Sequence, residues 1–205
     1  AHIQYKNLSI LIDTSPDIKE QFLKNKIKKL DAILYTHEHA DQTSGIFEMR
    51  PFFWKNKKKI PVYGSSRTIK SLKEKYTFCF TERHGYKPIM HAKKVKNNFL
   101  IKKNNKFLSI NIFDVTHGMI NASGFMFEKV AYISDCNRIP IKSLQYLYNL
   151  EYLVIDCLRE KKHPSHLNLN DALKLIKILK PKKTILTNLH IDLDYDYLRK
   201  KLPPN

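Results

Sequence analysis

The sequence has 205 residues, of which 42% are hydrophobic, and its formal net charge is +18 at pH 7. This length suffices for one domain with a sizeable buried core. No apolar run approaches the roughly 18–20 residues that a membrane-spanning helix needs, and the first residues lack the charged-then-apolar pattern of a secretion signal. We therefore expect a cytoplasmic protein with no membrane partner.

The excess of basic residues has two interpretations. Lys and Arg number 37 against 19 Asp and Glu, which favours a polyanionic partner such as nucleic acid, or a negatively charged substrate. Many of the lysines, however, stand in short polar runs that are typical of a solvated surface. The solvated surface is the simpler interpretation, and nucleic acid stays open as a partner.

The amino-terminal third alternates between strand and helix signals. Residues 8–12, LSILI, form a short apolar run that ends in a turn, and the whole amino end is predicted to form strands. Ser15 and Pro16 are typical of a helix start, and apolar residues recur at helical spacing as far as Ile27. Residues 31–36, DAILYT, then predict a buried strand followed by a polar loop. This is the α/β pattern, in which such loops carry ligands.

The rest of the chain continues the pattern with more β-structure. The sequence predicts a strand over 60–64, a helix over 66–75 and β-structure from 76 to 130, with a hairpin turning near Asn104. Further strands are predicted over 130–135, 150–157 and 184–189, with helices over 171–180 and around Asp196. No repeat or linker interrupts residues 1–205, so we predict one domain, a two-sheet sandwich flanked by helices. Because the chain enters a strand almost at Ala1, we expect that domain to lack its first strands.

The strongest local signal is the run Thr36-His-Glu-His-Ala-Asp41. His37 and His39 stand two residues apart after an apolar strand, and Asp41 follows two residues later. On an extended loop these side chains can turn toward one point. Imidazole and carboxylate are the usual ligands of zinc and similar divalent ions, so the run predicts a metal site.

Further polar residues stand where later predicted strands end. His117 closes SINIFDVTH, Asp135 closes VAYISD, and His190 follows TILTNL. Strand ends on one side of a sheet converge in space, which is where ligand sites form in α/β proteins. Together with the first three residues they make six candidate ligands, which exceeds the four of a closed structural zinc site and suits two ions.

The sequence resembles the metallo-β-lactamase superfamily through most of its length. The segment THEHADQTSGI is similar to the histidine-rich signature of that superfamily. HADQTSGIFEMR (39–50), HPSH (163–166) and LTNLHIDLDY (186–195) resemble elements of the branch that contains the phosphoribosyl 1,2-cyclic phosphate phosphodiesterase, and the likeness continues into DLDYDYLRKKLPP. The resemblance implies the αββα sandwich of that superfamily, with two mixed β-sheets flanked by helices.

The resemblance also implies a role for each matching metal ligand. One ion would be held by three histidines, a second by one acid and one histidine, and a further acid would bridge the two ions. These residues are His37, His39 and His117 for the first ion, Asp41 and His190 for the second, and Asp135 for the bridge.

Other residues would act on the substrate or support the site. Asp41 would orient the attacking hydroxide, and His166 would approach the scissile phosphate, to protonate the leaving oxygen or to bind the phosphoryl oxygen. Arg50 is a candidate for binding the anionic substrate. Asp13 matches an acid that stabilises the loop bearing the histidines, so we expect a structural role for it.

Two residues at the site depart from the pattern of the superfamily. Gln42 stands where a metal-binding histidine is usual, and an amide oxygen is a weaker ligand, so the second ion would be loosely held or absent. Asn188 stands where a Thr-His pair often supplies the last ligand. His190 has the same side-chain parity if the strand continues to it, and could substitute.

The expected activity is hydrolysis of a small or cyclic phosphodiester by a metal-bridging hydroxide, with one or two Zn²⁺ or Mn²⁺ ions as cofactors. The charge favours an alternative, a ribonuclease of the tRNA 3′-processing type, because phosphate contacts dominate affinity for nucleic acid. Gln42 suggests another alternative, a non-catalytic binding protein with a degraded metal site. A homodimer is one assembly that this interpretation allows.

Overall fold

The computed structural model describes residues 1–202, so the last two prolines of the DLDYDYLRKKLPP motif lie outside the described residues. The chain divides into two compact units, Ala1–Leu108 and Ser109–Asn205. We call them the amino-terminal and carboxyl-terminal units, and each has a hydrophobic core of its own.

The first sheet is mixed and has the strand order β1-β2-β3-β4-β5. β1 pairs antiparallel with β2, and each later pair of neighbours is parallel. All five residues of β2 and all three of β3 are buried, as expected of parallel strands that are covered on both faces. The strands are β1 (His2–Tyr5), β2 (Leu8–Ile12), β3 (Ala32–Leu34), β4 (Ile60–Gly64) and β5 (Met90–Lys94).

The second sheet is also mixed and has the strand order β11-β10-β9-β8-β7-β6. β9, β10 and β11 are parallel, whereas β8 is antiparallel to both β7 and β9. β7 therefore runs in the same direction as the three parallel strands. The strands are β6 (Asn98–Lys103), β7 (Lys106–His117), β8 (Ile120–Phe127), β9 (Val130–Ile133), β10 (Tyr152–Asp156) and β11 (Lys183–Thr187).

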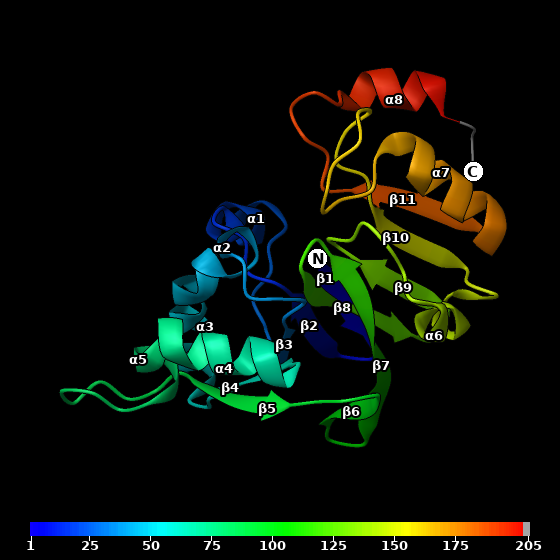
Figure 1. Cartoon of the computed structure of the whole chain (residues 1–205). Coiled ribbons are helices and arrows are strands. Elements are labelled where there is room, and N and C mark those ends of the chain that lie inside the picture. The colour runs from blue at the N-terminus through cyan, green and yellow to red at the C-terminus, as the bar shows by residue number, and fades with distance from the viewer. Residues whose placement is uncertain (203–205) are drawn as a thin grey trace. The chain divides into compact units, whose positions relative to one another are not determined.

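Helices cover the sheets, as Figure 1 shows. In the amino-terminal unit they are α1 (Ile18–Lys24), α2 (Ala40–Thr43), the 3₁₀ helix η1 (Ser44–Met49), α3 (Arg50–Asn56), α4 (Ser66–Lys75) and α5 (Thr77–Phe80). In the carboxyl-terminal unit they are α6 (Ile141–Leu144), the 3₁₀ helix η2 (Gln145–Leu147), α7 (Leu169–Leu179) and α8 (Tyr195–Lys201). The prediction of two mixed β-sheets flanked by helices is confirmed.

Helix starts follow local capping chemistry. The Ser65 side chain accepts a hydrogen bond from the Thr68 amide at the start of α4, and Asn168 does the same for the Asp171 amide at the start of α7. Each cap satisfies an amide that the first helical turn leaves without a partner. Both helices then bury one apolar face, as their spacing predicts.

Most predicted elements are confirmed, although several boundaries shift by one or two residues, and three differences have a clear structural cause or consequence. The first helix ends at Lys24 instead of reaching Ile27, since Lys26 adopts a left-handed φ of 54°. Residues 77–80, predicted as β-structure, form α5, which buries Cys79 and stacks Phe78 on Phe47 at 5.0 Å between ring centroids. Tertiary packing thus overrides the β propensity of that segment. The last strand ends at Thr187, two residues earlier than predicted.

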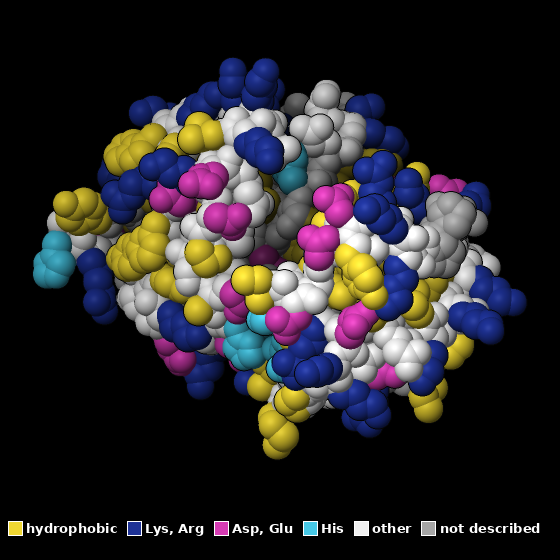
Figure 2. All heavy atoms as spheres, turned by 90° about the horizontal axis from the view of Figure 1, so that it is seen from above, with side chains coloured by type: hydrophobic (Ala, Val, Ile, Leu, Met, Phe, Trp, Pro, Cys, Tyr) yellow, Lys and Arg dark blue, Asp and Glu magenta, His cyan; other side chains and the backbone are white. Residues whose placement is uncertain are grey.

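On the face drawn in Figure 2, basic side chains are spread widely. Figure 2 shows lysines and arginines on many parts of one face, with acidic and apolar side chains between them. This distribution agrees with the interpretation of the lysines as a solvated surface. Among the residues that the structure describes, no helix is long and apolar enough to span a membrane.

Gly45 offers a test of how tightly the segment after the histidine loop is packed. A Cβ at this buried position would collide with the Ser15 carbonyl oxygen and lie 2.6 Å from Ile18 Cγ2. We expect Gly45→Ala to lower the free energy of unfolding by about 2 kcal/mol or more, because overpacking forces backbone shifts. Urea unfolding measures it. Gly64→Ala is the control, since its nearest neighbour, Tyr35 O, would lie at 3.4 Å; equal losses in both variants would contradict the packing argument.

Candidate metal centre

In the amino-terminal unit, the histidine loop starts where two parallel strands end side by side. Asp13 follows β2 and Thr36 follows β3, and the pairing of these strands brings the two residues to the same edge. The Asp13 carboxylate accepts hydrogen bonds from the Thr36 amide and the Thr36 hydroxyl, both at 2.8 Å. The expected structural role of Asp13 is thereby confirmed, because its buried carboxylate holds the first residue of the loop.

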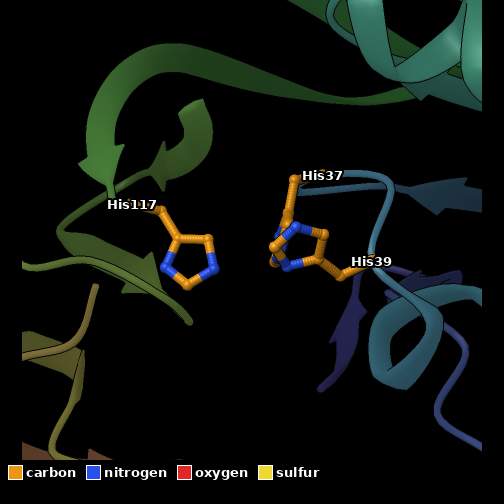
Figure 3. A group of neighbouring side chains, drawn as sticks. All are labelled: His37, His39 and His117. Carbon is orange, nitrogen blue, oxygen red and sulfur yellow. The ribbon is translucent and has the colours of Figure 1, made fainter. Parts of the chain in front are cut away.

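The same hydrogen bonds orient His37. Because the Thr36 hydroxyl donates its proton to Asp13, its oxygen acts as the acceptor toward His37 Nδ1, which lies 3.1 Å away. Nδ1 therefore carries the ring proton and Nε2 the lone pair, as a metal ligand requires. The rings of His37 and His39 pack edge to face at 4.5 Å, with ligand nitrogens within 4.8 Å of one another. Figure 3 shows both side chains on the loop after β3.

Glu38, between the two histidines, ties the loop to α4. Arg67 Nε donates to Glu38 Oε1 at 2.8 Å, and Lys75 Nζ donates to the Glu38 carbonyl oxygen at 2.8 Å. Glu38 itself is buried, and its Oε2 has no hydrogen-bond partner. Because alternate side chains of an extended segment point in opposite directions, Glu38 faces α4. No local pattern singles out Arg67 or Lys75, because basic residues are frequent along the whole chain.

Asp41 and Gln42 lie in α2, directly after His39. Asp41 is exposed, and its Oδ2 accepts a hydrogen bond from Gln42 Nε2 at 3.0 Å. The Gln42 amide thus contacts a candidate ligand through its nitrogen. Arg50 begins α3, and its guanidinium lies 5.7 Å from the centre of the Tyr86 ring.

In the carboxyl-terminal unit, a second group forms where strands of the same direction end. His117 ends β7, and Asp135 follows β9. His117 Nε2 lies 3.8 Å from Asp135 Oδ2, and His166 Nε2 lies 3.9 Å from the same oxygen. The ligand atoms of these three residues all lie within 4.8 Å of one another. The structure therefore joins two residues predicted as ligands to one predicted to act on substrate.

Both histidines of this group use Nδ1 for a structural hydrogen bond. His117 Nδ1 lies 2.8 Å from the Ser165 carbonyl oxygen, which can only accept. His166 Nδ1 lies 2.9 Å from Asp156 Oδ2. Nε2 is thus the atom that each ring presents to Asp135. Sequence reasoning missed Asp156, although this acid ends an apolar strand, the same signal that identified Asp135.

His190 lies apart from these groups. It follows β11 by three residues, and its side chain is 48% exposed, with Nδ1 3.3 Å from Asp192 Oδ2. The argument that Asn188 and His190 share strand parity is wrong, because β11 ends at Thr187 and Asn188 takes a left-handed φ of 65°. Within residues 1–202, neither Asp41 nor His190 joins a cluster of three potential ligands.

The cysteines take no part in this chemistry. Cys79, Cys136 and Cys157 are buried and form no disulfide. Burial raises the pKa of the thiols of Cys79 and Cys157 to about 12, and that of Cys136 well above its usual range. They are therefore protonated near neutral pH, whereas a metal ligand or nucleophile must be a thiolate.

Comparison with known proteins identifies the family. A family model described as a beta-lactamase superfamily domain matches residues 9–191. The chain belongs to the metallo-β-lactamase superfamily. A solved structure of a new diphosphatase from the PhnP family is 32% identical to it, with a TM-score of 0.89 over 99% of this chain and 77% of that one. This likeness confirms both the metallo-β-lactamase fold and the predicted branch of the superfamily.

Two further likenesses are more distant. An octanoyltransferase from Porphyromonas gingivalis is 28% identical over 200 residues, or 96% of this chain. This chain spans 40% of the length of that curated relative. Human tRNase Z, short form, has a TM-score of 0.75 at 16% identity over 93% of this chain and 85% of that one, which shows the fold alone.

The donor atoms in both units fit the divalent ions that superfamily members typically hold. They are imidazole nitrogens and carboxylate oxygens, which suit zinc and manganese. In their neutral form the rings of His37 and His117 carry the lone pair on Nε2, because Nδ1 of each ring donates its proton in a hydrogen bond. Such outer hydrogen bonds are the usual support of metal-binding histidines.

Thr36→Val tests whether the Asp13–Thr36–His37 chain supports metal binding. Valine keeps the shape of threonine but removes the hydroxyl that joins Asp13 to His37. We expect the free energy of unfolding to fall by about 1–3 kcal/mol and the affinity for Zn²⁺ to fall about 10–100-fold. Calorimetric titration measures the affinity. The exposed Thr81→Val is the control; lower stability with unchanged affinity would leave Thr36 a structural role only.

Proposed function

We propose that this superfamily member is a metal-dependent hydrolase that acts on a small or cyclic phosphodiester. The observation that carries the proposal is the group of His117, Asp135 and His166 at one edge of the second sheet, with both Nε2 atoms toward the carboxylate. The 32% identity to a diphosphatase of the PhnP family supports a phosphate ester as the substrate class.

We assign the metal ligands from the resemblance and from the donor chemistry. They are His37, His39 and Asp41 in the amino-terminal unit and His117, Asp135 and His190 in the carboxyl-terminal unit. Zn²⁺ or Mn²⁺ suits these donors, with one or two ions per chain because Gln42 is a poor ligand. When bound, the ions supply an activated water and neutralise negative charge on the phosphoryl group.

The remaining groups act on the substrate. Asp41 is exposed and can accept a hydrogen bond from the attacking water, which orients the nucleophile. His166 presents Nε2 and donates a proton to the leaving oxygen as the P–O bond breaks. Arg50 supplies positive charge for the anionic substrate.

RNA is the second candidate substrate. The net charge of +18 favours a polyanion, and tRNase Z shares the fold. On the face drawn in Figure 2, acidic and apolar side chains stand between the basic ones, whereas a bound polynucleotide needs a continuous basic track; this face therefore favours the smaller substrate.

A phosphodiesterase panel tests the proposed function. Metal-reconstituted protein is assayed on bis-p-nitrophenyl phosphate, a ribose cyclic phosphate, cyclic nucleotides and short RNA, with the metal content measured alongside. We expect turnover of a small diester and one to two ions per chain. His39→Ala, which loses an imidazole ligand, should lower both the turnover and the number of ions per chain. Less than about a tenth of an ion per chain after reconstitution would contradict the metalloenzyme assignment, and cleavage of RNA alone would establish the second candidate.

His166→Ala separates catalysis from metal binding. We expect this variant to keep its metal and to lose roughly 100-fold or more in turnover of an alkyl phosphodiester, the usual scale for a lost general acid. The loss should shrink on a p-nitrophenyl ester, because that leaving group needs no proton. Equal losses on both esters would instead make His166 a ligand of the phosphoryl oxygen. Loss of metal with activity would make it a metal ligand, and the assigned roles would be wrong.

A further inference from the structure

A buried carboxylate in the carboxyl-terminal unit has no role in the function proposed above. Asp156 ends β10, and its side chain is fully buried. We propose that Asp156 is the positioning residue of His166: it holds the proton on Nδ1 and directs Nε2 into the site, and Asn188 holds Asp156 in turn. The catalytic part of this inference rests on the proposed function, whereas the tautomer can be tested without it.

The hydrogen bonds of Asp156 define which atom carries the proton. Asp156 Oδ2 accepts from the Cys136 amide at 3.0 Å and from the Leu167 amide at 3.2 Å. Asp156 Oδ1 accepts from Asn188 Nδ2 at 3.1 Å. All these partners are donors, so the carboxylate is an acceptor toward His166 Nδ1 as well, at 2.9 Å. His166 is therefore protonated on Nδ1 whether its ring is neutral or charged.

The orientation of the ring follows from the same contact. With Nδ1 held against Asp156, the opposite nitrogen Nε2 lies 3.9 Å from Asp135 Oδ2. The His117 ring packs edge to face on the His166 ring, with 4.7 Å between the ring centroids. Asp156 and Asp135 thus stand on opposite sides of one imidazole, the first buried behind it and the second in the candidate metal centre.

Asn188 completes the support. It follows β11 in a left-handed conformation, which Asn tolerates better than most residues. Its Nδ2 donates to Asp156 Oδ1 and lies 3.3 Å from His166 Nδ1. Because Asn188 Nδ2 and His166 Nδ1 both carry protons, they form no hydrogen bond with each other. The hydrogen bond from Asn188 to Asp156 is therefore the one that supports the site. The Asn188 side chain therefore holds in place the Asp156 carboxylate, which in turn holds the His166 ring.

The arrangement gives the proton transfer a defined route. As the P–O bond to the leaving group breaks, the Nε2 proton of His166 passes to the leaving oxygen and the ring becomes neutral. Its Nδ1 proton stays on the hydrogen bond to Asp156, whose negative charge stabilises the ring while it is protonated. Water returns the proton to Nε2 after the product has left. Asp156 touches no reacting atom and acts through His166.

The first test observes the tautomer directly. The ¹⁵N shifts of the His166 ring, assigned by their loss in His166→Gln, should show a proton on Nδ1 in the native protein. Asp156→Asn should retain it, because an amide oxygen can still accept and the Asn188 amide can turn to match. Asp156→Ala should shift the proton toward Nε2. A native ring protonated only on Nε2 would overturn the proposal.

The second test is a double-mutant cycle on turnover of an alkyl phosphodiester. Asp156→Asn should lower turnover at least tenfold with the metal content unchanged, and should add nothing to His166→Ala, because the two residues act as one unit. Asp31→Asn is the matched control: Asp31 also accepts a backbone amide, from Ser9, and pairs with Lys103, so its small effect should be the same with and without His166. A loss that multiplies with that of His166→Ala would overturn the positioning role.

The choice of variants separates a loss of stability from a loss of turnover. Asp156→Ala leaves the Cys136 and Leu167 amides buried without an acceptor, at about 1–3 kcal/mol each, whereas Asp156→Asn and Asn188→Gly avoid that loss. Asn188→Gly keeps the left-handed backbone and removes only the amide donor; it should cause a smaller loss than Asp156→Asn. If the protein hydrolyses no phosphodiester but the tautomer changes as expected, the proposed function fails and the positioning role of Asp156 stands.

Discussion

Both candidate groups depend on hydrogen bonds to buried carboxylates, which stand at the ends of parallel strands. Asp13 ends the β2 segment and accepts the amide and hydroxyl of Thr36. Asp156 ends β10 and accepts two backbone amides and the His166 ring. In each case the acid satisfies donors of a neighbouring segment that would otherwise be buried without a partner, at a cost of about 1–3 kcal/mol each. The segments that carry the histidines are thereby fixed to their sheets.

These contacts also decide the chemistry of the histidines. His37, His117 and His166 each use Nδ1 in a hydrogen bond, with a hydroxyl, a backbone carbonyl and a carboxylate respectively. Each ring therefore presents Nε2. A lone pair on Nε2 binds a metal ion, and a proton on Nε2 serves an acid, so one arrangement of the backbone supports both roles.

The two residues that depart from the superfamily pattern have defined contacts. Gln42 donates to Asp41, and Asn188 donates to Asp156. Each amide thus orients a carboxylate in place of the imidazole that is usual in the superfamily. On the proposed ligand assignment, a second ion would find fewer strong ligands here, whereas the carboxylates of Asp41 and Asp156 each gain a hydrogen-bond donor.

Apolar periodicity and the HEHAD run are local signals, so the class of the fold, most of its elements and the candidate ligands near His37 can be predicted from the amino-acid sequence. Strands such as β2 and β4 and the helix α4 begin and end where the sequence predicts. The folded chain was needed to show that Asp156 and Asn188 lie behind His166, and that the last strand ends before Asn188. These contacts join residues 10 to 32 positions apart through strand pairing and a left-handed turn. No local pattern of residues encodes such distances, since they depend on which strands become neighbours.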